Sequence, residues 1–248
     1  MKISVLSSGS KGNCTYIEAG IHKILIDIGT SSLYVEKSLS LLGINPSDID
    51  IVLITHSHID HVKGLKVFNK KYKPLIYITD KILKEANLQE LDYNRINDLK
   101  DIQDTKINEI NLSHDVEDIK GYIIEDNNSS LVYITDTGYI NESYYDMLVN
   151  KNIYVFESNH DIEKLMNNPN YPHYTKIRIL GDKGHLSNKD SAYYLSKFIG
   201  NNTKQVVLAH ISEQNNTEEL ALNTLKETLE KKNINFQFIN HNSLYRMF

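Results

Sequence analysis

The sequence predicts an α+β fold in which two β-sheets lie against each other and helices cover their outer faces. Short runs rich in Ile, Val, Leu and Tyr alternate with stretches that have helical periodicity. No Pro-rich, low-complexity or highly charged linker interrupts the 248 residues, and no repeat of fixed period occurs. We therefore expect a single domain over residues 1–248.

Three short antiparallel strands are expected near the N-terminus, with a turn rich in Ser and Gly after the first. The stretch 50–55 is apolar through its middle, which is typical of a strand buried on both faces. In chain order, the expected strands are 3–6, 15–18, 23–27, 50–55, 75–78, 121–125, 131–135, 153–157, 205–209, 236–239 and 244–248.

Helices are expected where apolar residues recur every three or four positions. They are 33–41, 142–149, 187–199 and 217–232, and residues 62–68 look like the start of another. The helix at 187–199 has suitable residues at both ends, because Ser187 can cap its start and Gly200 follows its end.

The composition is that of an ordinary soluble protein with a net charge of −5. The single cysteine, Cys14, excludes an intramolecular disulfide, fits a reducing compartment and is expected to be buried. No window approaches the roughly 20 apolar residues of a membrane span, and no signal segment is recognisable. We therefore expect a cytoplasmic protein with no membrane partner, while a local basic groove remains compatible with the charge. The oligomeric state stays open.

The most informative motif is the loop 55–61, which follows the apolar strand and contains His56, His58, Asp60 and His61. Burying such groups together costs free energy unless a cation compensates for it. Imidazole nitrogen and carboxylate oxygen suit Zn²⁺, Mn²⁺ or Fe. His56 and His58 point the same way in an extended segment, whereas Asp60 and His61 can face a second position. One loop can thus contribute to two neighbouring ions; the alternative is a polar surface loop.

Four further polar residues follow expected strands or apolar runs: Asp27, His114, Asp136 and His210. Residues at strand ends collect at one edge of a sheet, where functional groups are usually found. Each also has a simpler interpretation, since Asp after a strand is often a turn residue. His241 is an alternative to His210, but it is better explained as a turn residue between the last two strands.

Together these pieces resemble the metallo-β-lactamase superfamily: Asp27, His56-x-His58-x-Asp60-His61, His114, Asp136 and a late histidine. The resemblance implies an αββα four-layer sandwich with two divalent metal ions at the sheet edges. One ion would be held by His56, His58 and His114. The other would be held by Asp60, His61 and the late histidine, with Asp136 bridging. Asp27 would orient the loop.

Four stretches resemble the YycJ (also WalJ or VicX) family within that superfamily: LSSGSKGN at 6–13, FESNHD at 156–161, ILGDKGHLSN at 179–188 and HISEQNN at 210–216. The stretch LAHIS at 208–212 is also similar to the late motif of transfer-RNA 3′-end-processing endonucleases. The resemblance implies a DNA exonuclease that works 5′ to 3′ on a nucleic-acid substrate, with hydroxide generated between the ions.

Other functions stay open. A small-substrate hydrolase acting on a thioester, lactone or cyclic nucleotide would use similar chemistry, and so would an RNA-processing nuclease. A non-catalytic metal-binding or flavin-using redox protein is a third class. The intact histidine set argues against a purely structural role, and Ser57 and Ile59 supply no carboxylate for a redox di-iron centre.

The catalytic candidates are Asp60, His185 and Glu157. His185 can donate a hydrogen bond to a phosphate or a proton to the leaving oxygen, or it is only a residue near a helix cap. Glu157 is expected to orient His185, as a similar pair does in the transfer-RNA-processing relatives. His160 either lines the pocket or is exposed. The turn residues Ser10 and Asn13 are candidates for substrate contact.

Two groups of basic residues can contact phosphates. Lys63, Lys66, Lys70, Lys71 and Lys73 follow the metal loop, although a solvated helix face explains them equally well. Lys176, Arg178 and Lys183 lie near the GHLSN element and are better placed for phosphate.

Overall fold

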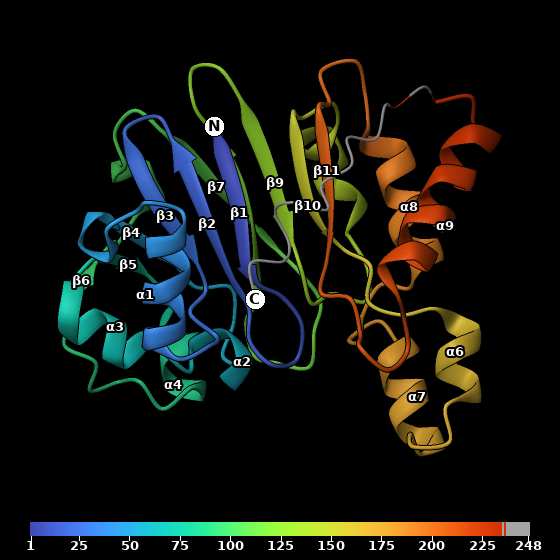
Figure 1. Cartoon of the computed structure of the whole chain (residues 1–248), viewed down its shortest axis with the longest axis horizontal. Coiled ribbons are helices and arrows are strands. Elements are labelled where there is room, and N and C mark those ends of the chain that lie inside the picture. The colour runs from blue at the N-terminus through green and yellow to red at the C-terminus, as the bar shows by residue number, and fades with distance from the viewer. Residues whose placement is uncertain (235, 237–248) are drawn as a thin grey trace.

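Two β-sheets lie face to face in the computed structural model, which describes residues 1–234 and 236, and helices cover the outer faces (Figure 1). This arrangement confirms the predicted αββα four-layer sandwich. The strands predicted at 236–239 and 244–248, and the alternative ligand His241, lie outside the described residues apart from Phe236.

The first sheet follows the order of the chain. It contains β1 (Lys2–Ser7), β2 (Cys14–Ala19), β3 (His22–Ile26), β4 (Ile51–Leu53), β5 (Leu75–Tyr77) and β6 (Asn94–Arg95). The first three strands are antiparallel, and β3 to β6 are parallel. All of β4 is buried, as predicted for an apolar run covered on both faces. The sequence does not predict β6, which consists of two exposed polar residues.

The second sheet has the order β11–β10–β9–β8–β7. Its strands are β7 (Lys106–Asn111), β8 (Lys120–Glu125), β9 (Ser130–Ile134), β10 (Ile153–Glu157) and β11 (Gln205–Ala209). The strands β7, β8 and β9 are antiparallel, whereas β9, β10 and β11 are parallel. Buried side chains from both sheets, among them Ile17, Leu53, Tyr122 and Val155, form the core between them.

Helices pack on both sides of the sandwich. The first sheet is covered by α1 (Ser32–Leu41), α2 (Ile59–Val62), α3 (Leu65–Tyr72) and α4 (Asp80–Glu85). The second is covered by α5 (Tyr145–Leu148), α8 (Asn188–Phe198) and α9 (Glu218–Lys231), while α6 (Ile162–Asn167) and α7 (His173–Leu180) extend beyond the sheet edge (Figure 1). The predicted helix at 142–149 is wrong in part, because Asn141 caps a 3₁₀ turn at Glu142–Tyr144 before α5 begins.

The strands that precede the candidate residues all end at the same edge of the sandwich (Figure 1). Asp27 follows β3, and the loop 55–61 follows the parallel strand β4. In the second sheet, Asp136 follows β9 and His210 follows the parallel strand β11. His114 comes after β7, which two antiparallel pairings make parallel to β9. The topology therefore places these candidate residues, which are far apart in the sequence, at one edge of the sandwich.

Candidate metal centre

Backbone contacts fix the loop that contains His56, His58, Asp60 and His61. The backbone N–H of Asn13 donates to the carbonyl of Asp60 at 2.7 Å, and the N–H of Gly29 donates to the carbonyl of Asn13 at 2.8 Å. This approach requires glycine at position 29, because a Cβ there would lie 1.6 Å from the Asp60 carbonyl oxygen. The segments around Asn13 and Gly29 thus hold the loop in place.

Three histidines form a first cluster. His56, His58 and His114 each offer a ring nitrogen, and these nitrogens lie within 4.8 Å of one another. The Nδ1 of His114 is 3.1 Å from the Gly184 carbonyl oxygen, so it donates there and leaves Nε2 as an acceptor. Burial lowers the pKa of His114 and lowers that of His56 well below its usual value. Both rings are therefore held in the neutral form that binds metals.

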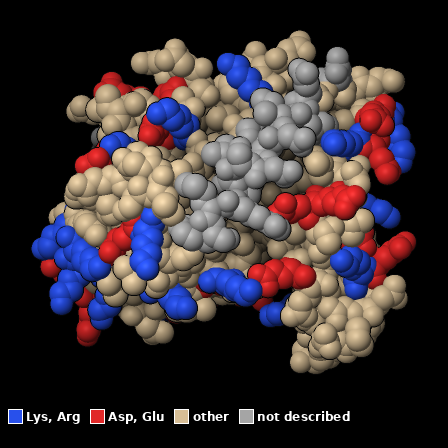
Figure 2. All heavy atoms as spheres, in the orientation of Figure 1, with Lys and Arg blue, Asp and Glu red and all other residues tan. Residues whose placement is uncertain are grey.

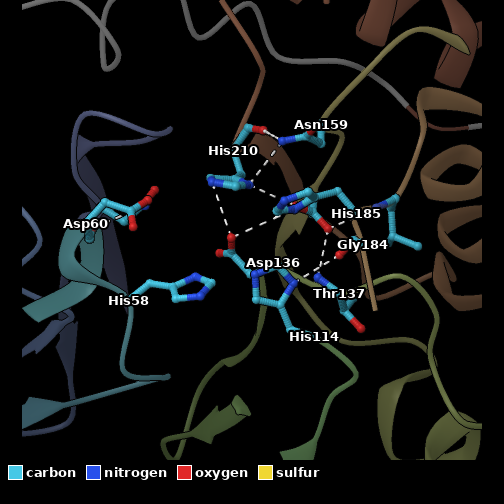
Figure 3. A network of polar contacts seen from close by, with 12 residues as sticks. His58, Asp60, His114, Asp136, Thr137, Asn159, Gly184, His185 and His210 are labelled. Carbon is cyan, nitrogen blue, oxygen red and sulfur yellow. Dashed lines mark hydrogen bonds and ion pairs between the residues drawn. The ribbon is translucent and has the colours of Figure 1, made fainter. Parts of the chain in front are cut away.

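Asp60, His61 and His210 form a second cluster, with ligand atoms again within 4.8 Å of one another. Asp136 lies between the histidines: its carboxylate is 3.4 Å from His61 Nε2 and 3.3 Å from His210 Nε2. Figure 3 shows His58, Asp60, His114, Asp136 and His210 directed toward a common space. The ligand atoms of His56, His61 and Asp136 also lie within 4.8 Å of one another, so Asp136 is close to members of both clusters.

The electrostatics and hydrogen bonding of these clusters fit bound cations. Burial by itself lowers the pKa of His210, but Asp136 and Glu157 raise it to about 9. Asp136 and Asp27 likewise overcome burial and raise the pKa of His61. Positive charge is therefore stabilised at the second cluster. In addition, His56 Nε2 and Asp136 Oδ2 are buried without a hydrogen-bond partner among the described residues, and a divalent ion would satisfy both.

Asp27 orients the loop from behind. It is fully buried and accepts hydrogen bonds at 2.8 Å from the backbone N–H of Thr55, the Thr55 hydroxyl and Nδ1 of His61. Since Nδ1 of His61 donates to this carboxylate, Nε2 is left to face Asp60 and Asp136.

Glu157 has the corresponding position in the second sheet. Its Oε1 accepts from Nδ1 of His185 at 2.8 Å and from Nδ1 of His210 at 2.9 Å, while Oε2 accepts two backbone N–H groups at 3.0 Å. Burial alone would raise the pKa of Glu157, but the charge of His185 and the hydrogen bonds from both rings hold it below its usual range. Glu157 is completely buried, so it acts on the site through the two histidines.

The sequence pattern that defines the metallo-β-lactamase superfamily matches residues 8–150 of this chain, which include the loop 55–61 and Asp136. The chain belongs to the metallo-β-lactamase superfamily. As a metallo-β-lactamase-fold protein it is a hydrolase, and the superfamily uses divalent metals.

Two curated relatives match nearly the whole metallo-β-lactamase domain. Exodeoxyribonuclease YycJ of Bacillus anthracis is 35% identical over 239 residues, which are 94% of this chain and 90% of the relative. Exodeoxyribonuclease WalJ of Streptococcus pneumoniae serotype 2 (strain D39 / NCTC 7466) is 34% identical over 242 residues, with the same coverage. The chain is therefore YycJ/WalJ-like, as the sequence motifs predict. The metallo-β-lactamase fold protein YhfI from Bacillus subtilis, 16% identical over 91% of this chain and 92% of its own, superposes with a TM-score of 0.67.

The remaining candidates have different positions. Ser10 is exposed on its loop. Asn13 is buried, and its Nδ2 lies 2.9 Å from His61 Nε2, so it touches a candidate ligand. The interpretation of His160 as an exposed residue is wrong: only 1% of it is accessible, and burial lowers its pKa to about 4.

Two residues near the site are missed by the sequence argument. The Ser8 hydroxyl accepts the backbone N–H of His210 at 2.7 Å. Asp115 lies 3.1 Å from His114 Nε2 and 3.6 Å from His58 Nε2, and it also pairs with Arg178 at 3.1 Å. The position of Asp115 beside His114 was a usable signal, whereas the Ser8 contact joins residues 202 positions apart.

Among the helices that the structure describes, none is long and apolar enough to cross a bilayer.

Proposed function

We propose that this chain is an exodeoxyribonuclease that hydrolyses DNA phosphodiesters from the 5′ end at a dinuclear metal centre. The observation that supports it most is the pair of adjacent candidate ligand clusters, with the imidazole of His185 beside them. The chain is also similar over 94% of its length to proteins named exodeoxyribonuclease. His56, His58 and His114 hold one ion in this proposal. Asp60, His61 and His210 hold the other, and Asp136 bridges them.

When bound, the two ions polarise the phosphoryl oxygens and lower the pKa of a water molecule, which is the chemistry that phosphodiester hydrolysis needs. Zn²⁺, Mn²⁺ and Fe²⁺ all suit these nitrogen and oxygen ligands. The protein's task is to keep each ligand in the tautomer and orientation that binds. Asp27 does this for His61, and Glu157 does it for His210.

His185 is the proton or hydrogen-bond donor in this proposal. Glu157 holds its Nδ1, so Nε2 is left for the substrate. Its side chain is 20% accessible, and its ring centroid lies 4.9 Å from that of His114 and 5.1 Å from that of His210. From there it can protonate the leaving oxygen or stabilise charge on the phosphate.

The test uses linear duplex DNA labelled at the 5′ or 3′ end, with Mn²⁺ or Zn²⁺, beside a covalently closed circle and an RNA of the same sequence. The 5′ label should appear at once in mononucleotides, the 3′-labelled strand should shorten gradually, and the circle and the RNA should stay intact. A His58→Ala, Asp60→Ala double variant should be inactive. His185→Ala should lose about 10²- to 10⁴-fold in kcat while it keeps its metal.

His22→Ala is the matched control, because His22 contacts Asp50 and the Gln103 carbonyl away from the metal centre. It should retain full activity. Equal degradation by the double variant, cleavage of the closed circle, or hydrolysis of a thioester with no attack on DNA would overturn the proposal.

A further inference from the structure

The segment that follows the metal loop is strongly basic in an acidic protein. Residues 62–79 contain five lysines and no Asp or Glu, although the whole chain has a net charge of −5. Figure 2 shows Lys and Arg side chains gathered over α3, at the left edge of the view. The charge is thus concentrated locally.

Four of these lysines lie on one side of the helical segment. Lys63, Lys66, Lys70 and Lys73 are spaced by three, four and three residues, which places them in a row along the exposed face. The opposite face is buried through Leu65, Phe68 and Asn69. We call this row the lysine stripe. It begins two residues after His61, directly after α2, and continues to the C-terminal end of α3.

The structure distinguishes these lysines from three of the other four basic candidates, Lys183 being the exception. Lys71 pairs with Glu36 at 2.7 Å, Arg178 pairs with Asp115, and Lys176 donates to the Met166 carbonyl. In the part of the chain that is described, no carboxylate forms an ion pair with any member of the lysine stripe. Its charge is therefore available to an external anion.

We propose that the lysine stripe binds successive phosphates of the DNA strand that leads away from the scissile phosphate. Lys66 and Lys73 are separated by seven residues, or about 10 Å of helix, and one DNA strand presents a phosphate every ~3.4 Å of duplex axis. The part of the stripe from Lys66 to Lys73 therefore spans about three phosphate intervals. The inference rests on the proposed function, since it assigns a binding surface to that nuclease. Phosphate contacts of this kind position a strand without reading its sequence, as a non-specific exonuclease requires.

The test replaces three stripe residues in one variant, Lys66→Gln, Lys70→Gln, Lys73→Gln. Its control removes the same charge from another part of the chain, by Lys204→Gln just before β11 and by Lys226→Gln and Lys231→Gln in α9. Binding of a fluorescent DNA duplex is measured by anisotropy between 50 and 300 mM salt, and KM and kcat are measured on the same duplex. Metal content and thermal melting show that both variants are folded.

The stripe variant should bind DNA at least about tenfold more weakly at low salt, and its slope of log K against log[salt] should be shallower by about 2 to 3. The loss should appear mainly in KM. The control should behave like the wild type. An unchanged salt slope in the stripe variant, or an equal loss of DNA affinity in the control, would overturn the inference. The proposed nuclease function would stand in that case, provided that the wild type cleaves DNA. A wild type that neither binds nor cleaves DNA would overturn the proposed function, and the stripe assignment with it.

Discussion

Glu157→Gln is the substitution that tests the organisation of the site most directly. The change keeps the size of the side chain and replaces one acceptor oxygen with an NH₂ donor. Glu157 accepts four hydrogen bonds, two from His185 and His210 and two from the backbone N–H groups of Thr137 and Leu186. A glutamine amide has only one acceptor atom, so either orientation sets its NH₂ against two N–H donors.

The magnitude follows from these four bonds. Each hydrogen bond to a charged group contributes about 1.5–3 kcal/mol, so losing two of them in a fully buried position costs about 3–6 kcal/mol. The rings can recover a bond by shifting their proton from Nδ1 to Nε2. His210 then loses the lone pair that would bind an ion. We expect metal affinity to fall 10- to 100-fold and turnover by about 10²- to 10⁴-fold.

Metal content after dialysis against buffered Zn²⁺ or Mn²⁺, together with the pH–rate profile at saturating metal, checks this prediction. Glu125→Gln is the matched control: it changes a carboxylate at the opposite end of the second sheet, where Lys151 is its partner at 2.7 Å. The control should retain metal and activity. A Glu157→Gln protein with wild-type metal content and an unchanged pH–rate profile would refute the role we give to Glu157.

Three further predictions concern the rest of the domain. Gly29→Ala should prevent the metal loop from forming, which would be measured as loss of bound metal and a lowered Tm. The control Gly43→Ala has a φ of +74° and open space around it, so it should lower the free energy of unfolding by only about 1–2 kcal/mol. EDTA should lower the Tm by about 5–11 °C for an ion present at 100 times its Kd, since such an ion contributes about 2.7 kcal/mol; an unchanged Tm would contradict a bound ion. Cys14 should react with iodoacetamide only after unfolding, because burial raises its pKa; mass spectrometry of the native protein would reveal any earlier labelling.

Local patterns predict most of the elements and most of the candidate ligands that the structure brings together. The apolar runs predict the strands β4, β10 and β11, of which β4 and β10 are completely buried. The loop 55–61 contains four candidate ligands within six residues. Asp27, Asp136 and His210 were found by one rule, that polar residues after strands meet at a sheet edge. The rule works here because the strands they follow point the same way.

Some contacts behind the candidate ligands are not given by these patterns: the resemblance predicts that Glu157 orients His185, but not that it also holds His210. Glu157 reaches His210 because β10 lies beside β11, and it reaches His185 because the segment before α8 passes the end of β10; nothing in the local sequence gives the strand order. Asn13 lies in a turn whose composition is typical of an exposed loop, yet close packing against Gly29 and Asp60 buries it. The arm formed by α6 and α7 buries a single side chain, Leu165, within its helices, so it lacks the apolar periodicity by which the other helices were predicted.

The backbone at the strand ends connects these observations. Asp27, Asp136 and His210 all have positive φ, at 60°, 58° and 55°. Asp and His adopt this left-handed conformation more readily than most residues, but it still costs about 1–2 kcal/mol each. The cost is offset locally: Thr55 donates to Asp27, and Ser8 and Asn159 hydrogen-bond the backbone of His210. A left-handed residue ends its strand abruptly, so the side chain lies at the edge of the sheet, where it can meet the ligands of the facing sheet. The same geometry explains why Gly29 and Gly138, each two residues after a left-handed aspartate, pack against backbone carbonyls of other segments that leave no room for a Cβ.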